Sequence, residues 1–511
     1  MSASVATGDG RRIGTPMTVA AVVLAVLFAA ASGLAPYLSS ALNSKTLSEK
    51  MLVIIPLALA VGIALLVLAM TRFAVFLMGV LLIRASVDVT RLSGSSAGNT
   101  QVNTSAARAL QPSVLLGVLC IVVALVWLAV ARYRLGALPG SRFRTALLAF
   151  FFAGLVSVLG AAHLSASALE ALRLLAAVLM FVVLEQLMID RQAMRQVLAA
   201  CIASAVFPVA FTLFGVAIGH PRSETKGHFT RLIGTFGQSN DYGRYLMVII
   251  IFGAAMYPQV SKRMRKWLAA LLAGAAICML LSLTITAVIG TVVGLVVLGL
   301  TQNKRILQAL MIAGVLSLAV APQFVSRFTS ATGVSASHLN SGAVNSSSSG
   351  SLSWRFSYWA QVLPLANSNP VTGIGLAMTQ YQTNQAKQPH NDFVRAYVET
   401  GLIGFLTYCG MLISMMSLGR RAVAATVRGT FERSVAAGFW GVAIAFSLVS
   451  AAANVLTNIA LVWYVMAFAA AAAAVLRQAR TRTALAGTAE PPPALAGAPG
   501  PRAVLAGPAD P

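Results

Sequence analysis

Charged side chains are scarce in this sequence, and acidic ones are the scarcest. Only 10% of the 511 residues are charged, whereas 58% are hydrophobic, and the mean hydropathy is +0.82. Soluble proteins carry about 25% charged residues, so the composition excludes an ordinary soluble protein. Apolar runs recur from Met17 onward, and each is about 20 residues long, which is enough to span a bilayer. Because a helix satisfies its own backbone hydrogen bonds in lipid, the sequence predicts an all-α, polytopic integral membrane protein.

Cysteine and histidine are also rare, which limits the kinds of site that the chain can build. The four cysteines lie in or beside apolar runs, and their spacing suits neither a zinc site nor a disulfide framework. We interpret them as small packing residues. The five histidines show no H-x-x-x-H pattern, and no loop carries a cluster of carboxylates with ligand spacing. We therefore expect no metal and no cofactor.

The shortage of acidic residues leaves a formal net charge of +24, from 37 Lys and Arg against 13 Asp and Glu. Such a charge could indicate a nucleic-acid partner. Many of the basic residues, however, lie on alternate short connections between the apolar runs, as the positive-inside rule requires of cytoplasmic loops. We therefore expect membrane lipids as partners, no nucleic acid, and both termini in the cytoplasm. The connections carry Arg72; Arg132, Arg134, Arg142 and Arg144; Arg191 and Arg195; Lys262, Arg263, Arg265 and Lys266; Lys304 and Arg305; and Arg420, Arg421, Arg428 and Arg433.

The apolar runs predict about 12–14 transmembrane helices. The first run is long and is not followed by a cleavage site and a soluble domain, so we expect a retained helix and not a signal peptide. The candidate spans are 17–36, 51–70, 73–89, 113–131, 145–162, 167–189, 195–219, 240–257, 268–284, 286–301, 305–321, 395–417, 434–452 and 459–476.

These runs divide the chain into a cytoplasmic tail, two sets of transmembrane helices, one large periplasmic loop and a disordered cytoplasmic tail. The loop should contain short helices, because residues 354–366 alternate aromatic and polar side chains at helical spacing, which is typical of an interfacial helix. Residues 329–353 are rich in Ser, Asn and Gly, and we expect them to be mobile. The five parts are 1–16, 17–321, 322–394, 395–476 and 477–511.

Polar groups concentrate at the end of this loop, in "QPHNDFVRAYVETGLIG" from Gln388 to Gly404. His390 stands where a helix should begin, and the helix dipole there favours a neutral imidazole, which can accept a proton. Asn391, Arg395 and Glu399 are spaced by four and should line one face. An Arg395–Glu399 pair would avoid an unpaired charge in the membrane. The alternative is a capped helix start with a purely structural ion pair.

A second cluster, "RLIGTFGQSNDYGRYL" at 231–246, runs from a loop into the next span. Arg231 and Arg244 lie at the boundary between water and lipid. The guanidinium fork matches phosphate oxygens, so we predict that both contact a phosphate-bearing ligand. The alternative is that these side chains only reach toward lipid headgroups.

A third cluster surrounds Arg355, which is flanked by aromatic side chains and followed by the turn Pro370–Gly375. Its alternative role is that of an interfacial anchor. Further intramembrane charges at Glu170, Arg173 and Glu185 are expected to pair structurally. Among the remaining histidines, His338 is the rival to His390.

The three clusters, in this order, resemble the O-antigen ligase and polymerase superfamily of bacterial inner membranes. The resemblance covers R-x-x-G-x-F-x-x-x-N from Arg231 to Asn240, R-x-x-x-W from Arg355 to Trp359, and N-P-x-x-G-x-G from Asn369 to Gly375. It also covers the His-Asn pair at His390, with Glu399, Gly401 and Gly404 after it. The motifs span about a third of the chain, and the many spans with one late loop fit nearly all of it.

The resemblance implies a metal-independent, inverting glycosyltransferase. It would transfer O-antigen from undecaprenyl pyrophosphate to lipid A-core at the periplasmic face of the inner membrane. His390 would be the catalytic residue, either as a base or by orienting the acceptor hydroxyl, and Arg231, Arg244 and Arg355 would bind the diphosphate. Asn240, Asn391, Arg395, Tyr397 and Glu399 would support them.

Three other functions remain open at this point. An O-antigen polymerase and a protein O-oligosaccharyltransferase would use the same lipid-linked donor. A polysaccharide transporter or flippase belongs to a different class, and transporters bind their substrate near the bilayer midplane between repeats. The sequence has no repeat at a fixed period, and its polar clusters gather at one face, which favours an enzyme.

Overall fold

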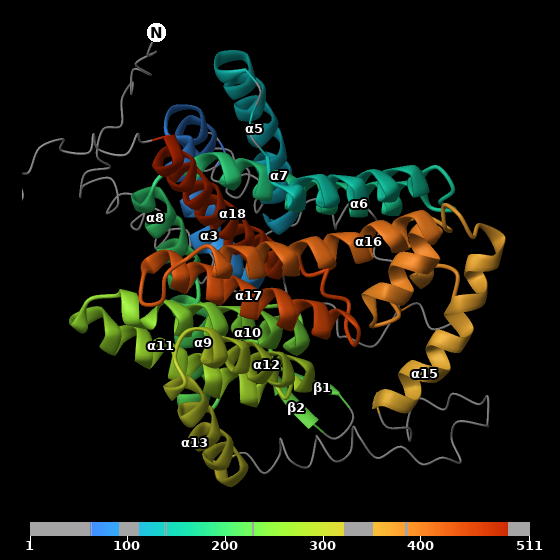
Figure 1. The fold of residues 1–511 in the computed structure, drawn as a ribbon. Helices are drawn as coiled ribbons and strands as arrows, with labels where there is room; N and C mark the ends of the chain where they lie inside the picture. The colour runs from blue at the N-terminus through green and yellow to red at the C-terminus, as the bar shows by residue number, and fades with distance from the viewer. Residues whose placement is uncertain are drawn as a thin grey trace, which may run out of the picture.

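The computed structural model describes residues 62, 64–90, 112–136, 138, 140–226, 229–320, 351–383 and 387–488. Within these ranges the protein is a bundle of α-helices with a single two-stranded hairpin (Figure 1). The expected all-α, polytopic membrane architecture is therefore confirmed. The predicted span 17–36, His338 and the stretch 329–350 lie outside the described residues.

Most helices follow the predicted spans. Their bounds are α3 Phe73–Val87, α5 Pro112–Leu135, α6 Arg142–Val158, α7 Leu164–Leu187, α8 Arg191–Ala203, α9 Val206–Ala217, α10 Ser239–Met256, α11 Lys262–Leu281, α12 Ile285–Thr301, α13 Arg305–Val320, α15 Ser351–Val362, α16 Asp392–Ala424, α17 Phe431–Ser450 and α18 Ile459–Thr488. Helix α18 continues past the predicted end at 476, so residues 477–488, which were expected to belong to a disordered tail, are helical. Short 3₁₀ turns occupy Asp88–Thr90, Tyr257–Gln259, Leu363–Ser368 and Met378–Gln380. Strands β1 (Ser223–Lys226) and β2 (Phe229–Leu232) pair antiparallel, with Glu224 opposite Arg231.

Seven helical segments among the described residues are long and apolar enough to cross a membrane. The number of spans, about 12–14 by the sequence, stays a prediction. The span predicted at 195–219 is divided in the structure into α8 and α9 by a break at Ser204 and Ala205. The seven segments are Ser113–Tyr133, Leu164–Leu187, Arg191–Ala217, Lys262–Leu281, Asp392–Ala424, Phe431–Ser450 and Ile459–Arg482.

The core of the bundle forms around α18. Within its most apolar window, 94% of the residues are buried inside the protein. The rings of Phe252 on α10 and Phe468 on α18 stack with centroids 3.8 Å apart. Small residues allow equally close contact elsewhere, since a Cβ on Gly441 of α17 would lie 2.8 Å from the carbonyl oxygen of Gly294 on α12. Membrane helices pack closely through such small residues.

One end of the bundle gathers the basic connections, and we call it the basic end. There, Arg191 lies 3.6 Å from Glu432, and Arg433 donates to the carbonyl of Thr301. Figure 1 shows the α10–α11 and α16–α17 connections on this side, at the left of the view. The contacts bring together connections that the positive-inside rule places on one side of the membrane.

The other end gathers the hairpin, α15, the start of α16 and the α17–α18 turn, and we call it the site end (Figure 1, right). The amide of His163, between α6 and α7, contacts the sulfur of Met378 at 3.4 Å. Thr284 donates to the carbonyl of Ser239 at the start of α10. The predicted site clusters therefore lie at the same end of the bundle.

Candidate functional site

Helix α16 is broken at Gly401, near the site end. Gly401 has φ 66° and ψ −166°, a conformation that is essentially restricted to glycine. The loop that begins at Pro370 crosses this break and forms hydrogen bonds with both sides. The amides of Ile374 and Gly375 donate to the carbonyls of Val398 and Glu399, at 3.1 and 3.0 Å. The backbone groups that the break exposes are thereby satisfied, as a membrane protein requires.

The loop and the broken helix approach so closely that side chains do not fit between them. The amides of Leu402 and Ile403 donate to the carbonyls of Pro370 and Val371. A Cβ on Gly373 would lie 2.4 Å from the backbone of Glu399. Gly373 itself has φ +76°. This geometry explains why the segments Asn369–Gly375 and His390–Gly404 both carry glycines.

Glu399 anchors the loop through its side chain as well. Its carboxylate accepts from the amide of Ala377 at 2.8 Å and from the hydroxyl of Thr379. The same carboxylate lies 2.9 Å from Nε of Arg395, so the predicted Arg395–Glu399 pair is present. Arg395 also reaches across to α7, where its Nη2 lies 2.7 Å from Glu170. Glu170 pairs in turn with Arg173 at 2.8 Å.

His390 lies directly before α16, in an unusual backbone conformation. Its φ is +52°, a left-handed value that non-glycine residues adopt rarely and often at functional sites. Asn391 is the N-cap, and its side-chain oxygen accepts from the amides of Phe393 and Val394. The helix therefore starts where the sequence predicted.

Helix α15 packs beside His390. The rings of Trp354 and His390 meet edge to face with centroids 5.8 Å apart, and Nε1 of Trp359 donates to the carbonyl of Pro389 at 2.6 Å. The hydroxyl of Tyr358 donates to the carbonyl of Lys387. Burial raises the pKa of the Tyr358 phenol above its ordinary value, so it remains a donor.

Arg355 lies on α15, directly after Trp354 and one helical turn before Trp359, and is partly exposed. The structure therefore places the helix that carries Arg355 against the segment that carries His390. Tyr397 is also partly exposed there, and its ring meets Phe405 edge to face.

The remaining predicted arginines lie on the hairpin and on α10. Arg231 is 5% exposed and stands opposite Glu224 on the hairpin. Arg244 is 4% exposed and lies 3.6 Å from Asp241. Asn240 occupies the first turn of α10 and is partly exposed. These residues lie at the site end, as His390 does, but on the hairpin and on α10, which are separate from α15 and α16.

Sequence reasoning did not place Asp392 in the site. This carboxylate is fully buried, and its Oδ2 accepts from the amides of Val455 and Leu456 in the α17–α18 turn. It also interacts electrostatically with Arg244 and Arg395. Asp392 therefore connects the start of α16 to the elements around α10. The sequence contains one signal for Asp392: it lies two residues after His390, in a chain that has few acidic residues.

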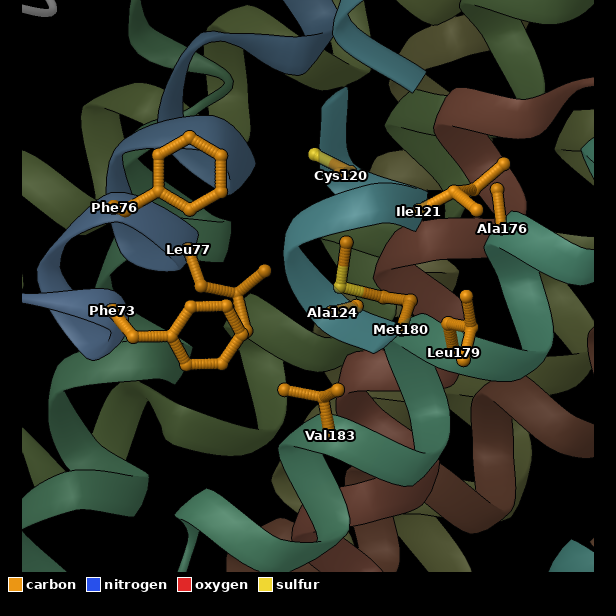
Figure 2. Close-up of a pocket in the computed structure, with 10 residues that line it drawn as sticks. All are labelled: Phe73, Phe76, Leu77, Cys120, Ile121, Ala124, Ala176, Leu179, Met180 and Val183. Atoms are coloured by element: carbon orange, nitrogen blue, oxygen red, sulfur yellow. The ribbon is translucent and has the colours of Figure 1, made fainter. Parts of the chain in front are cut away.

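A cavity between α3, α5 and α7 is too small to hold a substrate (Figure 2). It is lined by the side chains of Phe73, Phe76, Leu77, Cys120, Ile121, Ala124, Ala176, Leu179, Met180 and Val183. Its volume is about 10 Å³, and a single water needs about 10–15 Å³.

Within the described part of the chain, no three His, Cys, Asp or Glu side chains are grouped to hold a metal ion.

Comparison with known proteins identifies one family. A search of curated proteins found no match. The model of the O-antigen ligase family matches residues 268–409, a segment that includes Arg355, His390 and Glu399, whereas Arg231 and Arg244 precede it. This match confirms the resemblance that the motifs indicated: residues 268–409 are similar to the O-antigen ligase family.

Proposed function

We propose that the protein is an O-antigen ligase. It transfers O-antigen polysaccharide from undecaprenyl pyrophosphate to the lipid A-core oligosaccharide at the periplasmic face of the bacterial inner membrane. The observation that supports the proposal is the contact of α15, the helix that carries Arg355, with the segment that carries His390. Trp354 and Trp359 of this helix contact His390 and Pro389, inside the segment that matches the family.

In the proposed reaction, a hydroxyl of the acceptor sugar attacks the anomeric carbon of the lipid-linked glycan. The glycosyl bond to the diphosphate breaks, and the undecaprenyl diphosphate leaves with the bonding electron pair. His390 accepts the hydroxyl proton or orients the hydroxyl. A single displacement of this kind inverts the anomeric configuration. The donor is already activated, so the protein needs mainly positioning and cationic stabilisation.

The arginines divide into two roles in this proposal. Arg355 and Arg231 contact the departing diphosphate, whose negative charge grows as the bond breaks. Arg244, which is as deeply buried as Arg231, contributes its charge from beside Asp241. Arg395 is held between two carboxylates and supports the site together with Glu399. Asn240, Asn391 and Tyr397 complete the surroundings.

Deleting the gene in its host and separating the lipopolysaccharide on a gel tests this function. A ligase defect leaves bare lipid A-core while lipid-linked polymer accumulates. Core that carries a single repeat would identify a polymerase instead. Normal lipopolysaccharide, with glycan lost only from proteins, would identify a protein O-oligosaccharyltransferase. Lipid-linked glycan that stays on the cytoplasmic face would indicate a flippase.

A further inference from the structure

Glu170 belongs to none of the motifs that suggested the function, yet it contacts the segment that carries His390. It lies on α7 and is 2% exposed. One carboxylate oxygen is 2.7 Å from Nη2 of Arg395, and the other is 2.8 Å from Nη1 of Arg173. Because Arg395 also lies 2.9 Å from Glu399, its guanidinium joins carboxylates from two separate helices.

The four side chains balance in charge, with two carboxylates against two guanidinium groups. Three of them are almost completely buried, and Arg173 is the one that reaches the surface. Removing one partner of a buried ion pair is costly, because the remaining charge stays uncompensated. Loss of the Glu170 charge would therefore force Arg395 to shift or to rely on Glu399 alone.

A shift of Arg395 would move two parts of the site. Its backbone amide donates to the carbonyl of Asn391, so it lies one helical turn after the residue that follows His390. Its partner Glu399 holds the loop through Ala377 and Thr379. The network thus fixes both the start of α16 and the loop against the membrane bundle.

We propose that Glu170 is a positioning residue for glycan transfer, which acts through Arg395 and Glu399 to hold His390 and the crossing loop in place. The inference rests on the proposed function. Glu170 does not touch substrate in this account, so its loss should lower turnover without weakening donor binding. Misplacement of reacting groups by about 1 Å can cost roughly 100-fold in rate.

The same helix offers a matched control. Glu185 is also a glutamate of α7 with a side chain that is 2% exposed, but it pairs at the basic end. Its partners are the amide of Ser141, at 2.9 Å, and Arg144, at 3.8 Å. The variants Glu170→Gln and Glu185→Gln therefore remove the same charge, with the same shape change, at opposite ends of one helix.

Two measurements on the purified full-length protein compare these variants with wild type. The first is the rate of glycan transfer, with kcat and the donor KM determined separately. We expect Glu170→Gln to lower kcat by roughly 10-fold to 100-fold with little change in KM, and Glu185→Gln to retain kcat. The second is hydrogen–deuterium exchange, which needs no activity. Exchange in peptides covering 370–383 and 387–400 should accelerate in Glu170→Gln only.

The outcomes separate this inference from the function on which it rests. If Glu170→Gln keeps the kcat of Glu185→Gln and leaves exchange at 370–400 unchanged, Glu170 is not a positioning residue. If it only lowers the unfolding temperature while kcat is retained, its role is structural and the inference fails. If wild-type protein transfers no glycan, the proposed function fails, and exchange still decides whether Glu170 holds this segment.

Discussion

Replacing Gly401 with alanine perturbs the contact on which the whole site depends. The added Cβ would lie 2.2 Å from the carbonyl oxygen of Val371 and 2.6 Å from the amide nitrogen of Gly373. Both are backbone atoms, so no side chain can rotate away to relieve the overlap. Alanine would also have to adopt φ 66° and ψ −166°, which costs about 1–3 kcal/mol.

The rest of the cost comes from moving the loop. Four backbone hydrogen bonds join residues 370–375 to residues 398–403, and each contributes about 0.5–1.5 kcal/mol. If the loop moves enough to relieve the overlap, these bonds lengthen or break. Strain and lost hydrogen bonds together predict a destabilisation of at least about 3 kcal/mol, together with displacement of Glu399 and the loop.

Gly410→Ala provides the control for this prediction. Gly410 lies in the same helix, and a Cβ there would meet no atom within 4 Å, so this variant should be neutral or slightly stabilising because alanine favours helix. Thermal unfolding in detergent and the rate of glycan transfer can be measured on both variants. If Gly401→Ala unfolds at the same temperature as Gly410→Ala and transfers glycan equally well, the loop does not cross the helix as described.

Four further results are expected. His390→Ala should lower transfer by about 10²–10⁴-fold while donor binding, measured with radiolabelled lipid, is retained; loss of binding would contradict its role toward the acceptor. Arg355→Ala should lower kcat more than it weakens donor binding. Arg355→Lys should recover only part of the lost kcat, because an ammonium group lacks the bidentate fork of a guanidinium. Full recovery of kcat in Arg355→Lys would show that bidentate binding of the diphosphate is not needed. In a background lacking Cys409, an impermeant thiol reagent should label whole cells at Ser368→Cys but not at Lys262→Cys, and the reverse would overturn the topology. EDTA should leave transfer unchanged; loss restored by Mg²⁺ or Mn²⁺ would contradict metal independence.

Local patterns predicted the features that depend on local contacts. The helix predicted at 354–366 is present as α15 and the 3₁₀ turn after it. Its aromatic and polar residues alternate at helical spacing, so the helix has one aromatic face that can be buried. The Arg395–Glu399 pair follows from a spacing of four on a helix. The same holds for Glu170 and Arg173 at a spacing of three.

Features that depend on distant segments were not predictable from spacing. The pair of Glu170 and Arg395 joins residues 225 positions apart, and nothing local indicates which buried charges will meet. The break at Gly401 was also not predictable from the sequence, because the apolar run 395–417 is continuous. The break is stabilised by hydrogen bonds to the crossing loop, which comes from a distant segment. Asp392 was missed for the same reason, since its partners lie in the α17–α18 turn.

Reconstituted transfer tests the central claim most directly. Purified protein in liposomes would receive undecaprenyl-diphosphate-linked glycan and lipid A-core, with His390→Ala as the matched inactive control. We expect lipid A-core that carries the glycan, with inverted anomeric configuration and release of undecaprenyl diphosphate. No product on lipid A-core, or equal product from His390→Ala, would contradict it.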